Sequence, residues 1–264
     1  MIRGETMILK DMEKYLHSQL VTLRDVYGCV GIKSEFENEG SDYRDLILLR
    51  YLTAKTGLKL FIKIGGVEAF TDLKMAIHLN ADGVVIPMVE SAFALIKSQN
   101  MINDIVGQTN GDFDVFINIE TKTAVENLGD ILAAMNTSIK GITIGRSDLS
   151  YSYGMKGEQD SDATNVTVEE IVNIATSRGV QQLTIGGGIS KKTFNNKYLI
   201  NNIIPKLTHI ETRNVIFKAG SIHFPEALLR ALDFERNYLN YKLEKNRLFF
   251  KADESRFDTL MTRG

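Results

Sequence analysis

The chain has 264 residues, of which 44% are hydrophobic and 24% charged, so it can bury a large core and is neither disordered nor fibrous. Its formal charge of −2, without a long basic run, gives no sign of binding to nucleic acid or to an anionic membrane. The one cysteine, Cys29, excludes an internal disulfide framework. The start of the chain is charged and lacks the apolar segment of a signal peptide, and no stretch approaches the roughly 18 apolar residues of a membrane span. Together these features predict a cytoplasmic protein without a membrane partner.

Short apolar runs alternate with helical patterns along the chain, after a first segment, 1–27, that is expected to be helical or extended. Most of the apolar runs are rich in Val, Ile and Phe with little polar alternation, as parallel strands covered on both faces should be. Regular alternation of strand and helix predicts βαβ units and a parallel sheet. In chain order the expected elements are a strand at 28–33, a helix at 43–57, a strand at 58–64, a helix at 67–81, a strand at 82–88, a helix at 91–107, a strand at 114–120, a helix at 123–136, a strand at 140–145, a helix at 167–179, a strand at 182–187, and two short strands or one bent strand at 208–212 and 214–219.

Local signals mark two helix ends. Gly57 is a typical stop residue for the helix at 43–57, and Thr167 followed by Glu170 is a capping-box signature for the helix at 167–179. No Gly/Ser-rich or Pro-rich linker divides the chain. We therefore expect a single domain over residues 1–264 with the fold of a (β/α)8 TIM barrel, which commonly takes about 250 residues.

The last helical pattern is long and amphipathic, with a helix expected at about 224–248. Its apolar residues exceed one narrow stripe, and large exposed apolar patches are rare on monomers. We therefore expect a homo-oligomer in which roughly 224–243 packs against a neighbouring subunit. The apolar residues concerned are Leu228, Leu229, Leu232, Phe234, Tyr238 and Leu239.

Charged and amide side chains gather where the apolar strands end. Because the active site of a (β/α)8 barrel lies at the C-terminal ends of its strands, we expect these side chains to meet at the barrel mouth. They are Lys33 and Glu35 after the first strand, Lys63 after the second, Asn118 and Glu120 after the fourth, and Arg146 and Asp148 after the fifth.

Glu120 ends a buried strand, where desolvating a carboxylate is expensive unless a positive partner is near. Asp148 follows the next strand, so the two carboxylates should repel each other unless they share a proton or a cation. Oxygen ligands of this kind are preferred by Mg²⁺ and Mn²⁺, and no His pair or Cys cluster suggests zinc. The alternative is that Glu120 caps the following helix and Asp148 caps the turn before Leu149.

Three roles are possible for Lys63. Its side chain could extend to solvent, it could neutralise the charge of a substrate carboxylate or enolate, or it could form a Schiff base with the substrate. The stretch "GGGIS" at 186–190 invites a phosphate-loop interpretation, but glycine clusters at strand ends are too common to establish one. None of the four histidines lies in a spacing that indicates a metal ligand or a catalytic triad.

Three segments, "DGVVIPMVES", "INIETKTAVENLGDIL" and "GITIGRSDLSYSYG", resemble in order and spacing the HpcH/HpaI aldolase and citrate lyase β-subunit family. The resemblance is specific over about 80–155 and looser over 28–66. It implies a modified TIM barrel of the phosphoenolpyruvate/pyruvate type. Members cleave or form carbon–carbon bonds next to a keto acid or acyl thioester, usually with a divalent metal.

By this resemblance Glu120 and Asp148 are the metal ligands, and Asn118 lies where the aldolases carry a glutamine beside the metal. The neighbours of Asp148 are expected to contact substrate. These are Gly145, Ser147 and Arg146, the last toward a distal acidic group unless it forms a surface salt bridge instead.

Two positions depart from the family pattern. Lys63 stands where the aldolases have an arginine that stabilises the enolate. The positive charge is kept, but a lysine cannot form the two parallel hydrogen bonds of a guanidinium group. Phe36 stands where the aldolases have a histidine that assists acid/base chemistry. Lys33, Glu35, Glu37 or a metal-bound water must then supply that function.

These observations predict a metal-dependent carbon–carbon lyase or aldolase that uses Mg²⁺, Mn²⁺ or another divalent metal. Its substrates would be a 2-oxo acid of the pyruvate type and an aldehyde or acyl partner. Lys63 would balance the developing oxyanion, and Glu35 would orient Lys63 or a water. One alternative is a metal-free aldolase in which Lys63 forms a Schiff base. Another is a non-catalytic barrel that binds a small acid.

Overall fold

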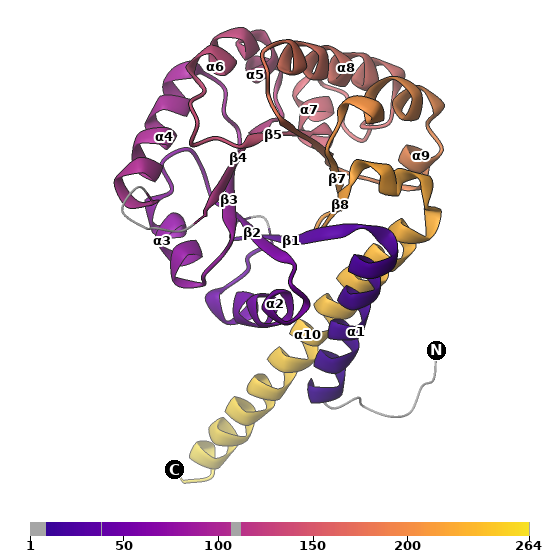
Figure 1. Cartoon of the computed structure of the whole chain (residues 1–264). Coiled ribbons are helices and arrows are strands. Elements are labelled where there is room, and N and C mark those ends of the chain that lie inside the picture. The colour runs from indigo at the N-terminus through magenta and orange to yellow at the C-terminus, as the bar shows by residue number, and fades with distance from the viewer. Residues whose placement is uncertain (1–8, 38, 107–111, 264) are drawn as a thin grey trace.

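The computed structural model describes residues 9–37, 39–106 and 112–263. In these residues eight strands close into a barrel in the order β1 to β8, with helices around the outside (Figure 1). All the expected strands are confirmed, with ends that differ by one or two residues. They are β1 (Cys29–Glu35), β2 (Lys59–Lys63), β3 (Gly83–Ile86), β4 (Asp114–Ile119), β5 (Gly141–Gly145), β6 (Gln182–Gly186), β7 (His209–Glu211) and β8 (Val215–Lys218).

The last strand runs against the others. Neighbouring strands from β1 to β7 pair in parallel, whereas β8 pairs antiparallel with both β7 and β1. Segments 208–212 and 214–219 are therefore two strands of a hairpin, joined by residues 212–214. Three residues suffice for a hairpin turn, but a parallel crossover needs a dozen or more. The expected α/β barrel is confirmed, and the hairpin is its departure from the regular (β/α)8 pattern.

Most of the expected helices are confirmed, and the helix expected at 123–136 is two helices divided at Asn127. In the first segment, residues 9–27 are helical rather than extended, and residues 1–8 lie outside the described residues. The helices are α1 (Leu9–Tyr27), α2 (Tyr43–Thr56), α3 (Phe70–His78), α4 (Ala92–Val106), α5 (Lys122–Glu126), α6 (Leu128–Ala134), α7 (Arg146–Ser152), α8 (Asp162–Ser177), α9 (Lys191–Phe194) and α10 (Pro225–Met261), with short π or 3₁₀ turns at Leu199–Ile203, Ile204–Lys206 and Ala219–His223.

One of the two expected helix-end signals is confirmed. Gly57 ends α2 in the left-handed conformation, with φ of 67°, and its N–H donates to the carbonyl of Thr53. The capping box expected at Thr167 is wrong, because Thr167 lies inside α8 and its hydroxyl donates to the carbonyl of Ala163. Ser161 caps α8 instead, accepting from the N–H of Thr164, so the helix begins more than a turn earlier.

The two faces of each strand carry different side chains. The outward residues, such as Ile62 and Ile117, are fully buried beneath the helices. Inside the barrel, Phe61 and Phe116 pack edge to face, with ring centroids 5.6 Å apart. Because side chains alternate along a strand, the residues two positions further on also point inward, toward the C-terminal mouth. This alternation places Lys63 and Asn118 at that mouth.

The long helix α10 packs along α1 and then continues beyond the barrel, as its yellow end in Figure 1 shows. The packed part is held by an ion pair of 3.0 Å between Lys242 and Asp45 and by a hydrogen bond from Tyr241 to Glu13. In the described part of the chain, no helix combines the length and the apolar character needed to cross a membrane.

Candidate active site

A cavity of about 400 Å³ opens at the C-terminal ends of the strands. It brings together all the residues expected to form the site except Arg146 and Glu37. These are Lys33, Glu35, Lys63, Asn118, Glu120, Gly145, Ser147 and Asp148, joined by residues that were not expected there, among them Glu211, Arg213 and Glu235.

Glu120 is the most deeply buried carboxylate of the cavity, with 1% of its surface exposed. One oxygen accepts from the N–H of Met88 and the other from the side-chain amide of Asn118, each at 3.0 Å. It does not cap the following helix, because α5 is capped by the hydroxyl of Thr121. Burial raises the pKa of the Glu120 carboxyl. Lys63 opposes this rise, and the like charge of Asp148 adds to it.

Asn118 supplies a further oxygen at the same point. Its amide nitrogen donates to Glu120, but its buried oxygen Oδ1 has no hydrogen-bond partner in the structure. A buried acceptor without a donor is costly, and a cation or a donor from a ligand would satisfy it. Two carboxylates and this oxygen form an oxygen-only set that fits Mg²⁺ or Mn²⁺. Within the described ranges, no three His, Cys, Asp or Glu side chains converge as a metal site, so open positions would go to water or substrate.

Two glycines allow close backbone packing around the site. A Cβ at Gly145 would lie 2.4 Å from Oε2 of Glu120, so a side chain there would displace the carboxylate. Gly187, with φ of 74°, lies against the backbone where β5 ends and α7 begins, and a Cβ there would be 2.5 Å from the nitrogen of Ser147. The role expected for Gly145, contact with substrate, is therefore joined by a packing role.

Lys63 and Glu35 face each other across β1 and β2, where they are register partners. Their side chains form an ion pair of 3.5 Å and are 19% and 13% exposed, respectively. Lys63 therefore does not extend to solvent, and its position favours the two interpretations in which it faces a substrate. Phe36, at the position of the family's histidine, packs against the hydrophobic core outside the set of residues that line the cavity.

A second ion pair lies beside the first. Lys33 on β1 binds Glu211 on β7. Burial alone would lower the pKa of Lys33, but Glu211, with smaller effects from Glu35 and Glu120, raises it overall. The sequence carries a signal for Glu211 that was missed, since β7 ends in the same Ile-Glu-Thr triplet as β4.

Arg146 is not part of the cavity, so its expected contact with substrate and its alternative of a surface salt bridge are both wrong. Its side chain is fully buried and forms an ion pair of 2.9 Å with Asp160. Its remaining donors bind the carbonyls of Gly186 and Gly187 and the hydroxyl of Thr193. A guanidinium with this many partners ties the end of β6 to the loop before α8.

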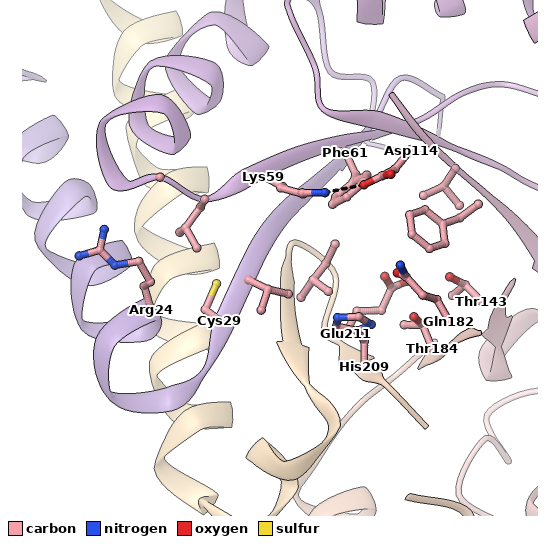
Figure 2. A pocket seen from close by; sticks show the side chains of 16 residues that line it. Arg24, Cys29, Lys59, Phe61, Asp114, Thr143, Gln182, Thr184, His209 and Glu211 are labelled. Atoms are coloured by element: carbon pink, nitrogen blue, oxygen red, sulfur yellow. Dashed lines mark hydrogen bonds and ion pairs between the residues drawn. The ribbon is translucent and has the colours of Figure 1, made fainter. Parts of the chain in front are cut away.

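A second cavity, of about 460 Å³, lies at the N-terminal ends of the strands (Figure 2). The ring of Phe61 lies beside the ion pair between Lys59 and Asp114. Phe116 also lines this cavity. Although it is slightly larger, it lacks the paired carboxylates of the first cavity, and active sites of this fold lie at the other end. We therefore place the candidate active site in the first cavity.

Comparison with known proteins adds to this geometry. The model of the family described as HpcH/HpaI aldolase/citrate lyase matches residues 46–186. Over 84 residues the chain is 33% identical to a 4-hydroxy-2-oxo-heptane-1,7-dioate aldolase from Salmonella arizonae, a match that covers 32% of this chain and 31% of that relative. The chain thus spans about a third of the length of that protein.

Solved structures share the fold at low sequence identity. A crystal structure of an HpcH/HpaI aldolase from Desulfitobacterium hafniense has a TM-score of 0.60 and 15% identity, covering 78% of this chain and 83% of that one. A protein described as HpcH/HpaI aldolase/citrate lyase family, from Burkholderia cenocepacia, has a TM-score of 0.60 and 16% identity, covering 87% and 91%.

Proposed function

Because the chain belongs to the HpcH/HpaI aldolase/citrate lyase family, we propose that it is a metal-dependent carbon–carbon lyase acting on a 2-oxo acid and an aldehyde or acyl partner. Membership confirms the resemblance seen in the sequence. In the direction of synthesis with an aldehyde, C3 of pyruvate loses a proton and bonds to the aldehyde carbon, and the aldehyde oxygen gains a proton. The reaction conserves all atoms of the two substrates, and it needs no oxidant or reductant.

The observation that supports this proposal is the arrangement around Glu120. A carboxylate that is 1% exposed lies beside a second carboxylate, Asp148, and beside the unpaired oxygen of Asn118. Such a set is unfavourable by itself, and a divalent cation would satisfy all three groups. Bound there, Mg²⁺ or Mn²⁺ would act as a Lewis acid toward the carboxylate and keto oxygen of the 2-oxo acid.

The remaining residues would position the substrate and move protons. Lys63 presents a positive charge next to the developing oxyanion, and its ion pair with Glu35 fixes the direction of the ammonium group. Glu35 is the carboxylate closest to that charge and is our candidate to hold or relay a proton through water. Ser147, which lines the cavity next to Asp148, would contribute a hydrogen bond to the substrate.

Removing one ligand at a time tests the metal site. Glu120→Gln and Asp148→Asn nearly conserve volume, so each protein should fold, lose Mn²⁺ binding measured by calorimetry, and lose turnover of pyruvate with an aldehyde. Glu126→Gln and Asp130→Asn are matched controls, since both residues are exposed. Normal Mn²⁺ affinity in both site variants would show that these carboxylates do not hold the metal.

The Schiff-base alternative is less well supported, because the ion pair with Glu35 fits a role for Lys63 as a fixed positive charge. Borohydride added with pyruvate should give no covalent adduct, whereas an imine at Lys63 would be trapped. The non-catalytic alternative would be excluded by metal-dependent turnover of any 2-oxo acid.

We also propose that the protein is a homo-oligomer. In α10, Leu228, Phe234 and Tyr238 are buried against the chain itself, but Leu239 and Leu243 are 57% and 49% exposed. Further along the helix, the exposed apolar residues are Leu248, Phe249, Phe250, Phe257, Leu260 and Met261. A second copy of the chain would cover this surface.

Light scattering tests the oligomer. The native protein should have a mass of at least two chains, and Leu239→Lys with Leu243→Lys should lower it. Phe93→Lys, on exposed α4, is the matched control. A monomeric native protein would contradict the proposal.

A further inference from the structure

We propose that the cavity at the N-terminal ends of the strands is a second ligand site, for a neutral aromatic molecule that carries an N–H or O–H donor. This site is separate from the candidate active site and does not depend on the proposed lyase function. The inference follows from the open interior of the barrel, from the pairing of the charges that line the cavity, and from the hydrogen bonds around His209.

The interior of the barrel is not filled at this end. In most barrels of eight strands, inward side chains pack the interior in layers. Gly31 and Gly83 lie two residues before the inward-facing Lys33 and Val85, so they are inward positions without side chains. The ring of Phe61 lies against both, since a Cβ at Gly31 or Gly83 would be 3.3 or 3.0 Å from it. Phe61 therefore packs along the wall of the barrel and leaves a cavity of about 460 Å³, a volume typical of small-molecule sites.

The cavity has an apolar side and a polar side. The apolar side is a hydrophobic cluster separate from the main core, formed by Phe61, Val85, Phe116 and Ile216. The polar side comes from β6 and β7, where Thr184 and His209 are register partners and Gln182 precedes Thr184 on the same face (Figure 2). Among the described residues, the side chains of Gln182 and Thr184 have no hydrogen-bond partner, so both are available to a ligand. An aromatic ligand would pack against the apolar side and turn its polar edge toward β6 and β7.

The charges that line this cavity are already paired, which favours a neutral ligand. Every Lys, Arg, Asp and Glu of the lining takes part in an ion pair, and the pairs are Lys59–Asp114, Lys33–Glu211 and Arg24–Asp25. A charged ligand would have to break one of these pairs or remain without a counter-ion. The candidate active site differs, because its carboxylates Glu120 and Asp148 carry like charges.

His209 supplies a hydrogen-bond acceptor. The hydroxyl of Thr208 donates to the carbonyl of Leu183 at 2.9 Å, so Nδ1 of His209, 2.8 Å from that hydroxyl, must be the donor of their hydrogen bond. Burial, together with the charges of Lys218 and Lys59, lowers the pKa of His209 and so keeps its ring neutral at neutral pH. A neutral imidazole whose proton is on Nδ1 presents an acceptor at Nε2. The ligand group that matches this acceptor is an N–H or O–H donor.

Calorimetric titration with neutral probes tests the site. Indole is compared with benzofuran, and phenol with fluorobenzene, because the second member of each pair keeps the ring but lacks the donor. The native protein should bind the donor of at least one pair saturably and about fivefold more tightly than its counterpart. His209→Phe should remove that preference, whereas His223→Phe, at an exposed histidine, should retain it.

A second variant tests the location without changing a polar group. Val30 lines the cavity and is half-buried, so the ring in Val30→Phe should occupy part of the space and lower the affinity for the probes by about tenfold or more. Val26→Phe, at a position of α1 that is 62% exposed, is the matched control. Asp148→Asn, in the other cavity, should leave the affinities within about twofold of the native values.

Three results of these titrations would overturn the inference. They are the absence of saturable binding, equal affinity for the two members of both pairs, and a preference that survives in His209→Phe. Loss of binding in Asp148→Asn but not in Val30→Phe would overturn it too, because the probe would then occupy the candidate active site. Circular dichroism shows whether each variant is folded, and His209→Phe decides the question alone if Val30→Phe does not fold.

Discussion

Lys33 on β1 and Glu211 on β7 form an ion pair inside the barrel, across the reversed strand β8 that separates their strands. Their side chains are only 12% and 6% exposed. The ion pair therefore links the two strands that flank β8, and the β1–β8 ladder itself is irregular between Cys29 and Gly31. Glu211 also lines both cavities and so lies between the candidate active site and the N-terminal cavity.

Removing only one partner of the Lys33–Glu211 ion pair should destabilise the folded protein. Lys33→Met leaves the Glu211 carboxylate buried without a partner and should lower the free energy of unfolding by about 3 kcal/mol or more. The double variant Lys33→Met/Glu211→Leu should recover much of that loss, because apolar side chains of similar volume replace a buried pair well. Urea unfolding of both variants and of Glu211→Leu gives the coupling energy.

Lys59→Met is the matched control, because it breaks an ion pair with Asp114 in which the lysine is 54% exposed. We expect a loss below about 1 kcal/mol there. If Lys33→Met is no more destabilising than Lys59→Met, the buried pair does not stabilise the barrel.

Arg146 should behave as a structural residue. Arg146→Met leaves Asp160 without its cation and the carbonyls of Gly186 and Gly187 without donors, so the free energy of unfolding should fall by about 3–5 kcal/mol. Arg146→Lys should recover part of this and should have a KM for pyruvate near that of the native protein. A stable Arg146→Met protein with a raised KM would return Arg146 to the substrate-binding residues.

The sequence predicted the barrel well because its strands are short apolar runs separated by helical patterns of the right length. It also indicated that Asn118 and Glu120 end one strand and that Asp148 follows the next, since position along a parallel strand decides which side chains reach the mouth. The residues it placed correctly are those whose location follows from chain order alone.

What the sequence did not show depends on contacts between distant segments. The direction of β8 is set by a three-residue turn that fits a hairpin or a bend equally well. The environment of Arg146 depends on Asp160 and Thr193, which no local pattern links to it. Glu235 reaches the site only because α10 passes beside the hairpin. Glu235 is far in sequence from the strand ends, so no local pattern indicates that it reaches the site.

Glu235 should make stability depend on pH. Burial raises the pKa of its carboxyl, against which the hydrogen bonds from Thr212 and Asn214 act. A carboxyl whose pKa is higher in the folded protein binds its proton more tightly there. The folded state is therefore penalised progressively as pH rises from the unfolded pKa of about 4.3 through the folded value.

Glu235→Gln removes that penalty and keeps an oxygen that can accept both hydrogen bonds. The free energy of unfolding of the variant should therefore rise relative to the native protein between about pH 4 and neutrality. Urea unfolding across this range checks the trend, with Glu226→Gln on the exposed start of α10 as the matched control. A difference that stays constant with pH, or that falls as pH rises, would show that the Glu235 carboxyl is not shifted in this direction.

The last prediction concerns Lys63, whose substitution distinguishes the metal-dependent mechanism from the Schiff-base mechanism. If it stabilises an enolate by its charge, Lys63→Arg should keep measurable activity, because a guanidinium suits an oxyanion and can still pair with Glu35. Lys63→Met should lose roughly 2.7–4 kcal/mol of transition-state stabilisation, by analogy with the loss of one oxyanion donor, or about a hundred- to thousandfold in kcat. Calorimetry of Mn²⁺ and pyruvate binding shows whether the site is intact in each variant. A Schiff-base lysine predicts instead that arginine is as inactive as methionine, since guanidinium does not form an imine at neutral pH. An inactive Lys63→Arg protein that binds both ligands normally would therefore favour the imine mechanism over the electrostatic one.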